Sequence, residues 1–294
     1  LTLQIGGGLG LLAGVTIGLL AGPALVLGLP WSTRFAEDPV VTVLVLTVQL
    51  VIVLAVSLGY VVLGVALEPF RLRLAGARRL SRREAEYLLP ILHDCARRLG
   101  VDNVPRLVVD DGREPNALAY TRHIVVYRGL LTEFKHDRDV VASILSHELV
   151  HWHNADGVAR LTLRGIALPV YLVYAAATWL MRVGDNAFIR FLTMLVSWPV
   201  LASVRFLIVP VQSAGAREAE YRADQGAVVA GQLPGLRRAL ERFQRSFDSS
   251  RNGWDRAICA SHPPAELRLE RLEQAGEPYP LLPGAEARRA ANPA

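Results

Sequence analysis

The hydrophobic residues of this 294-residue chain gather in long uncharged runs, separated by segments in which apolar and charged residues are mixed. No charge occurs from Leu1 to Thr33, and none in the 29 residues from Pro39 to Leu67. Each run exceeds the roughly 20 apolar residues that a helix needs to cross a bilayer. Neither run has the polar face of a core helix in a soluble protein. We therefore predict two transmembrane helices within residues 1–67.

Two further apolar stretches lie later in the chain. Residues 165–181 are uncharged and flanked by arginines, whereas residues 187–212 contain Arg190, Arg205 and two prolines. Charges inside a membrane span are costly and usually face protein or water. Residues 161–213 therefore allow two arrangements, a transmembrane hairpin or a hairpin that lies against the membrane surface.

The segments between these runs have the patterns of a small folded domain. Ser81-Arg82-Arg83-Glu84 has the form of a capping box and opens a helix to about Arg98. Runs of β-branched residues predict strands at Val104–Val109 and Ile124–Tyr127. Asn116 falls on or before a short edge strand between them. Residues 233–250 read as an amphipathic helix, so we predict a mainly α fold with a small β-sheet.

The five residues from His147 to His151 form the motif H-E-L-V-H. The segment reads as a helix, where positions four apart share a face, so the two imidazoles can point at one metal ion. Glu148 is then placed to act as a base on a metal-bound water. Zinc suits the site because it accepts imidazole and carboxylate ligands in tetrahedral geometry. The alternative is a polar helix with two histidines and no metal.

A catalytic zinc needs a third protein ligand and leaves its fourth position to water. The segment from Ala216 to Asp224 also reads as helical, and Glu220 and Asp224 lie one turn apart on the same face. One carboxylate can bind the metal while the other holds a ligand histidine through its free ring N–H. The spacing does not say which carboxylate does which, and a solvated Glu/Arg face would account for the charges equally well.

Four motifs occur in a fixed order along the chain. They are P-N-A-L-A from Pro115, H-E-L-V-H from His147 with Asn154 and Asp156 after it, A-R-E-A-E-Y-R-A-D from Ala216, and S-H-P-P from Ser261. The set resembles the M48 family of membrane zinc metallopeptidases, and within it the HtpX-like heat-shock proteases, over residues 68–275. The resemblance implies a polytopic membrane protein with a gluzincin-type metallopeptidase domain. The family layout has four spans, which favours a transmembrane hairpin at residues 161–213.

The resemblance also implies roles for individual residues. It makes Glu220 the ligand that joins His147 and His151 on a single Zn²⁺, with Asp224 and Asn154 as supporting residues around the ligands. Asn116 and Ala117 are implied to lie beside the polypeptide substrate. Ala216, Leu118, Tyr120-Thr121 and Val150 depart from the residues usual in the family, and none of these changes removes a ligand or the base.

His262, in the S-H-P-P segment, has two interpretations. It can stabilise the oxyanion or orient the site, which would make it catalytic together with Glu148. It can equally be a histidine that shapes a turn. Spacing alone leaves both open.

Basic residues predict how the chain lies in the membrane. Six arginines follow the second predicted span with no acidic residue among them: Arg71, Arg73, Arg78, Arg79, Arg82 and Arg83. The positive-inside rule therefore places residues 68–160 in the cytoplasm. The resemblance implies that the membrane is a plasma membrane of the bacterial inner type. The hairpin returns residues 214–277 to the same side. The net charge of +5 belongs to these membrane-facing arginines, and no nucleic-acid motif occurs.

These features give the domain organisation. Residues 1–67 hold two transmembrane helices, and residues 68–160 the first part of a cytoplasmic catalytic domain. Residues 161–213 form the hairpin, residues 214–277 complete the catalytic domain, and residues 278–294 form a flexible tail. Cys95 and Cys259 are expected in the reducing cytosol without a disulfide, with Cys95 in the core.

The resemblance implies zinc-dependent cleavage of misfolded or damaged membrane proteins, at the lipid bilayer and on its cytoplasmic face, as protein quality control, and this is the function we predict. A CAAX-type prenyl-protein endopeptidase is the nearest alternative, but that branch has seven spans and this chain offers at most four. A membrane transporter or adaptor with a structural zinc is a third possibility. Structural zinc sites usually close all four positions with protein ligands, and no fourth Cys or His is offered.

Overall fold

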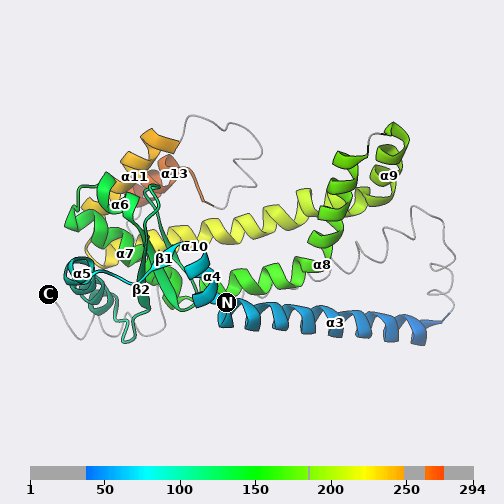
Figure 1. Ribbon diagram of the computed structural model, residues 1–294, viewed down its shortest axis with the longest axis horizontal. Coiled ribbons are helices and arrows are strands. Elements are labelled where there is room, and N and C mark those ends of the chain that lie inside the picture. Colours follow the sequence, from blue (N-terminus) through cyan, green and yellow to red (C-terminus); the bar gives the residue numbers. More distant parts are fainter. Residues whose placement is uncertain (1–37, 185, 248–261, 275–294) are drawn as a thin grey trace. The chain divides into compact units, whose positions relative to one another are not determined.

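The computed structural model describes residues 38–184, 186–247 and 262–274 (Figure 1). The first predicted transmembrane helix, the tail at 278–294 and Cys259 lie outside the described residues. The chain divides into two compact units, one made of residues 1–64 and 159–215 and the other of residues 65–158 and 216–294. The first holds the apolar helices and the second holds the motifs.

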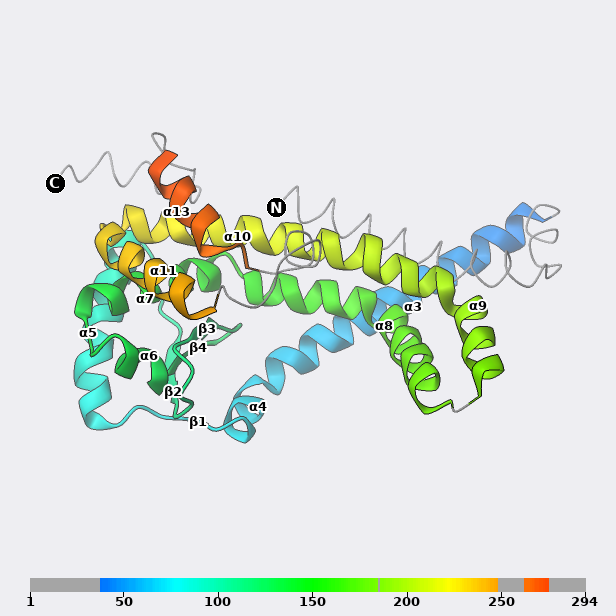
Figure 2. The same ribbon diagram turned by 90° about the horizontal axis from the view of Figure 1, so that it is seen from above.

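The apolar unit contains the helices that the uncharged runs predict. α3 (Pro39–Ala66) covers the second predicted span, and α8 (Asp156–Val183) covers residues 165–181. α9 (Ala187–Ser203), the π-helical turn η1 (Val204–Ile208) and α10 (Val209–Val229) form one continuous helical stretch, whose residues from Ala216 onward belong to the second unit. α8 and α9 run in opposite directions, as a hairpin requires (Figure 2).

Length and composition make two of these stretches candidates for crossing a membrane. Within the described part of the chain they are Asp156–Val183 and Ala187–Val229. A third candidate is the pair formed by Leu50–Ala66 and α4 (Glu68–Leu74), which is bent by 59°. Large aromatic side chains stay exposed on α8, α9 and η1, as lipid contact would allow: Trp179, Phe188, Phe191, Trp198 and Phe206.

Small residues let the apolar helices approach closely. A Cβ added at Gly165 of α8 would lie 2.8 Å from Cα of Ser57 on α3. At the same crossing, Ser57 Oγ donates a hydrogen bond to the carbonyl oxygen of Thr162, 3.3 Å away. Close contact through small residues with hydrogen bonds to the partner helix is typical of helices packed in a bilayer.

The second unit is built around a four-stranded sheet with the order β1-β2-β4-β3. β2 (Arg106–Asp110) and β4 (His123–Tyr127) are parallel, whereas β1 (Ala77–Arg78) and β3 (Ala117–Ala119) pair antiparallel with them at the two edges. The two predicted strands are confirmed to within two residues at each end. Asn116 immediately precedes the edge strand β3, as predicted.

The helix α5 (Arg82–Leu99) begins at the predicted capping box. Ser81 Oγ accepts a hydrogen bond from the backbone N–H of Glu84, and the Glu84 carboxylate accepts one from the N–H of Ser81, 2.7 Å away. The guanidinium of Arg78 donates to the same carboxylate over 2.8 Å, which ties the helix to β1. Cys95 is fully buried in this helix, as expected.

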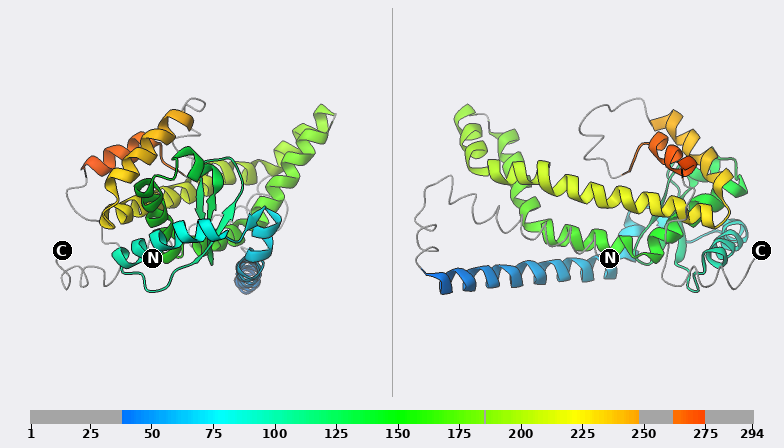
Figure 3. Two further views of the ribbon diagram at one scale, coloured as in Figure 1. Left: turned by 60° about the vertical axis from the view of Figure 1, so that its left-hand side comes forward. Right: turned by 180° about the vertical axis from the view of Figure 1, so that it is seen from behind.

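The helix that carries H-E-L-V-H is α7 (Arg138–His153), and residues 140–151 of it are all buried. Its neighbours are α5, the strands β3 and β4, and α11 (Leu233–Phe247). A helix covered on every side shows no polar stripe, which explains why α7 lacks an amphipathic pattern. The remaining helices are α6 (Arg128–Glu133) and α13 (Ala265–Gln274), and α13 lies against α11 (Figure 3).

Candidate metal centre

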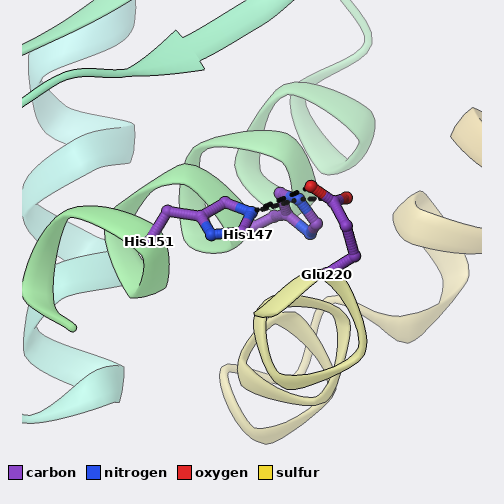
Figure 4. Close-up of side chains that lie close together, drawn as sticks. All are labelled: His147, His151 and Glu220. Atoms are coloured by element: carbon purple, nitrogen blue, oxygen red, sulfur yellow. Dashed lines mark hydrogen bonds and ion pairs between the residues drawn. The ribbon is translucent and has the colours of Figure 1, made fainter. Parts of the chain in front are cut away.

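Three buried side chains converge on one point in the second unit. His147 and His151 project from the same face of α7, and Glu220 reaches them from α10 (Figure 4). The two imidazole Nε2 atoms are 3.2 Å apart. One oxygen of Glu220 lies 3.4 Å from Nε2 of His147, and the other lies 3.4 Å from Nε2 of His151. These residues form a group that could hold a metal ion.

The outer nitrogen of each ring is bound by a carboxylate. Nδ1 of His147 lies 2.9 Å from Oδ1 of Asp224, and Nδ1 of His151 lies 2.8 Å from Oδ2 of Asp156. An ionised carboxylate only accepts hydrogen bonds, so each Nδ1 carries the hydrogen. The lone pairs of both Nε2 atoms therefore turn toward each other and toward Glu220.

This geometry fits a tetrahedral metal. Two Nε2 atoms and the two oxygens of one carboxylate meet at 3.2–3.4 Å, an arrangement that a cation among them stabilises, whether it is a metal ion or a proton. Two ligands bonded to a tetrahedral zinc at 2.0–2.1 Å are about 3.3 Å apart. The donor set of two imidazoles and one carboxylate is also the one that zinc accepts in catalytic sites.

The electrostatics of the site favour positive charge at the same point. Burial alone would lower the pKa of His151, but the Asp156 and Glu220 carboxylates raise it to about 10. The pKa of His147 is also raised, because Asp224 and Glu220 outweigh the effect of burial. A proton and a metal ion compete for such a position, and the field of three carboxylates stabilises either one.

Glu148 lies beside this centre, in contact with the sheet. Its side chain is buried, and Oε2 accepts a hydrogen bond from the backbone N–H of Ala119, 2.6 Å away. Ala119 is the last residue of the edge strand β3. β3 therefore fixes the position of the Glu148 carboxylate.

The outer edge of β3 faces away from the rest of the sheet. Hydrogen bonds from Tyr127 N–H to the Asn116 carbonyl, and from Tyr120 N–H to the His123 carbonyl, set the alternation of the β3–β4 ladder. The backbone groups of Ala117 and Ala119 must then point outward. Asn116 Oδ1 accepts from the N–H of Ala117 over 2.9 Å, so its side chain shapes the start of this edge.

Two residues of the C-terminal segment complete the centre. Nδ1 of His262 is 3.0 Å from Glu220, and its side chain is 62% exposed, which places the ring at the rim of the site. Arg268 is nearly buried on α13, where its Nε donates to Asp224 over 2.7 Å and its guanidinium lies 3.5 Å from Glu220. The sequence reading overlooked Arg268, because no local pattern separates it from the other basic residues of that helix.

Asp156 occupies the position beside a ligand ring where Asn154 was expected. Asn154 ends α7, and its backbone N–H donates to the carbonyl of Val150 over 2.9 Å. Its side chain makes no hydrogen bond to either histidine among the described residues. The chain then passes through Ala155, whose φ of 55° is left-handed and turns Asp156 back toward His151. In the sequence, the N-x-D spacing of Asn154 and Asp156 was the pattern that could have pointed to Asp156.

Glycine lets the helix of the third carboxylate reach α7. A Cβ added at Gly226 of α10 would lie 2.2 Å from Cγ2 of Val150. Val150 is larger than the residue usual at this place in the motif, and Gly226 leaves room for it. The pair sets how closely Glu220 and Asp224 approach the histidines.

Comparison with known proteins shows the family of the chain. The family model described as Peptidase family M48 matches residues 82–275. A "Protease HtpX homolog" of Salinibacter ruber is 29% identical over 69% of this chain and 79% of its own length. Proteins with the same name from Bordetella petrii and Bordetella pertussis are 28% and 30% identical, over 80% and 66% of this chain and over 89% and 72% of their own lengths. No solved structure matches the chain.

Proposed function

This chain belongs to peptidase family M48, and from that premise we propose that it is a zinc-dependent endopeptidase that cleaves membrane proteins. As a member of the family it is a metallopeptidase and acts on polypeptides. The observation that carries the proposal is the meeting of two Nε2 lone pairs and a carboxylate at 3.2–3.4 Å, beside a buried Glu148. We propose His147, His151 and Glu220 as the ligands of one Zn²⁺.

The residues around the ligands would set their orientation. Asp224 and Asp156 hold the two rings through their Nδ1–H groups, which raises the basicity of each Nε2. Arg268 neutralises part of the carboxylate charge by binding Asp224. We propose Asp156 in the supporting role expected of Asn154.

Glu148 is proposed as the general base. A zinc ion, when bound, lowers the pKa of water and polarises the scissile carbonyl. Glu148 takes a proton from the attacking water and delivers it to the leaving nitrogen of the peptide. The hydrogen bond from the N–H of Ala119 holds the Glu148 carboxylate in position. His262, at the rim, is placed to donate a hydrogen bond to the oxygen that gains charge.

The substrate is proposed to bind in extended form along β3. The N–H groups of Ala117 and Ala119 bind Asn116 and Glu148, so the outward carbonyl of Ala117 is the group proposed to accept a hydrogen bond from an added strand. Asn116 and Ala117 would contact that strand at its beginning. β3 ends at Ala119, which binds Glu148. A peptide paired with β3 would therefore have a peptide bond close to the general base.

Both alternative functions lack this support. A structural zinc in a transporter or adaptor would not need a buried carboxylate beside three ligands, with no fourth protein ligand among the described residues. A CAAX-type endopeptidase would need more spans than the two or three that the described helices offer. The named relatives are proteases of the HtpX type.

Removal and return of the metal tests the proposal. Treatment of the detergent-purified protein with a chelator should abolish cleavage of an unfolded protein substrate, because Glu148 alone cannot activate water. Returning one equivalent of Zn²⁺ should restore it, whereas Mg²⁺, which prefers oxygen ligands, should not. Cleavage that persists in a chelated sample shown to be free of metal would contradict the proposal.

We also propose that the metal centre lies on the cytoplasmic side of a bacterial inner membrane, where it acts in quality control. The arginine-rich segment after α3 supports this orientation, and the resemblance to heat-shock proteases supports the role. A reporter inserted into the full chain after Arg83 or after Gln274 should be cytoplasmic, and one after Gly184 should lie across the membrane. Opposite sides for Arg83 and Gln274 would exclude a single metal site.

A further inference from the structure

We propose that Glu68 is a positioning residue for peptide hydrolysis: it fixes the turn between β3 and β4, and through this turn the backbone N–H that holds Glu148. This role rests on the function proposed above and goes beyond it. Glu68 touches neither the ligands nor the substrate edge. It would act on the base through the backbone alone.

The carboxylate of Glu68 is buried and fully bonded. The residue is 4% exposed, at the first position of α4. One oxygen accepts from the N–H of Arg122 over 2.9 Å and lies 2.8 Å from Nδ1 of His123. The other accepts from the N–H of Thr121 over 2.9 Å and from the Thr121 hydroxyl. Four donors from three consecutive residues therefore converge on one side chain.

The connection between β3 and β4 consists of Tyr120, Thr121 and Arg122, and the third donor residue, His123, is the first residue of β4. Tyr120 N–H donates to the carbonyl of His123 over 2.8 Å and closes this turn. The preceding residue, Ala119, donates its N–H to Glu148. A movement of the turn would therefore move the donor that aims the base.

The turn is also fastened to the metal helix. The indole N–H of Trp152, the residue after His151, donates to the carbonyl of Thr121 over 3.1 Å. A Cβ added at Gly157, the residue after Asp156, would lie 3.2 Å from the Tyr120 backbone. These contacts hold one face of the turn against the site, and Glu68 holds the N–H groups of the turn.

Burying a carboxylate is costly unless every lone pair is used, and a helix of seven residues gains little from an acid at its first turn. An apolar residue could fill the space without that cost. The carboxylate provides four bonds that an apolar residue cannot, and two of them hold backbone N–H groups two and three residues after Ala119. This favours a positioning role over general stabilisation of the fold.

Glu68→Gln tests the role, because glutamine keeps the shape but presents an NH₂ group to a set of donors. We expect kcat, counted per metal-loaded chain, to fall by between about tenfold and a hundredfold, since small displacements of a catalytic group have effects of this size. KM for a short peptide should change by less than about threefold, and zinc content should stay at one per chain. Amide exchange at residues 119–122 should become faster.

Thr121→Val is the second variant, because it removes one hydroxyl donor and keeps the branched side chain. Thr121→Val should lower kcat by a smaller factor than Glu68→Gln does. It also allows the test to be made if Glu68→Gln does not fold. Glu86→Gln is the matched control: Glu86 is 62% exposed, pairs with Arg82 and is remote from the turn. It should leave kcat and exchange unchanged.

Each outcome separates the two proposals. Wild-type kcat in metal-loaded Glu68→Gln and Thr121→Val would overturn the positioning role and leave the peptidase proposal standing. A fall in zinc content that accounts for all lost activity would also overturn it. Absence of metal-dependent hydrolysis by the wild-type protein would instead overturn the proposed function, and the role of Glu68 with it.

Discussion

Glu148→Gln should retain its metal and lose nearly all peptidase activity. Glutamine has the shape of glutamate and its side-chain oxygen can still accept the hydrogen bond from Ala119, so the site should keep its geometry. The amide cannot take up the proton of the attacking water. General acid–base catalysis contributes about 10²–10⁴-fold to a rate, and kcat should fall by at least this factor.

The measurement pairs kcat on a peptide substrate with zinc content by elemental analysis. Both values are needed, because loss of activity with loss of zinc would show damage to the ligands rather than to the base. Glu86→Gln makes the same chemical change on the exposed face of α5 and should behave as the wild-type protein. Wild-type turnover in Glu148→Gln would remove this residue from the mechanism.

Glu220→Ala should lose the metal itself. The substitution takes away the only carboxylate within 3.4 Å of both Nε2 atoms among the described residues, and two imidazoles on one helix form an incomplete site. Loss of a partner that only supports a ligand weakens metal binding about 10–100-fold, so loss of a ligand should exceed this. The variant also lacks the negative charge that Glu220 places beside the two histidines and Arg268. This loss should lower the melting temperature of the protein.

Glu218→Ala is the matched control for this variant. Two residues along an α-helix correspond to about 200° of rotation, so Glu218 lies away from the face that carries Glu220. Zinc content and affinity, measured by elemental analysis and competition with a chelator, should be normal in Glu218→Ala. Equal zinc in both variants would mean that the third ligand is another residue.

Local patterns predicted most of the elements of this protein. The uncharged run at 39–67 predicted α3, because a helix without a polar face needs no partner beyond lipid. The capping box at Ser81 predicted the start of α5, because its hydrogen bonds span three residues. The spacing of His147 and His151 predicted that they share a face, because it equals about one helical turn. Each of these interactions is complete within a few residues.

The sequence by itself therefore determined the apolar helices, the small sheet and the helix with its two histidines. Only the tertiary structure decided how the carboxylates divide their work. Spacing left Glu220 and Asp224 equivalent, but in the fold Glu220 meets both Nε2 atoms, and Asp224 lies against Nδ1 of His147. This choice depends on how α10 crosses α7 at Gly226, which no local pattern encodes.

The same holds for the residues that support the site. Arg268 meets Asp224 across 44 positions of the chain, Ala119 meets Glu148 across 29, and Glu68 meets Thr121 across 53. A hydrogen bond forms only where the packing of the core brings donor and acceptor to about 3 Å. The sequence supplies these groups, and the packed helices and sheet decide which of them meet.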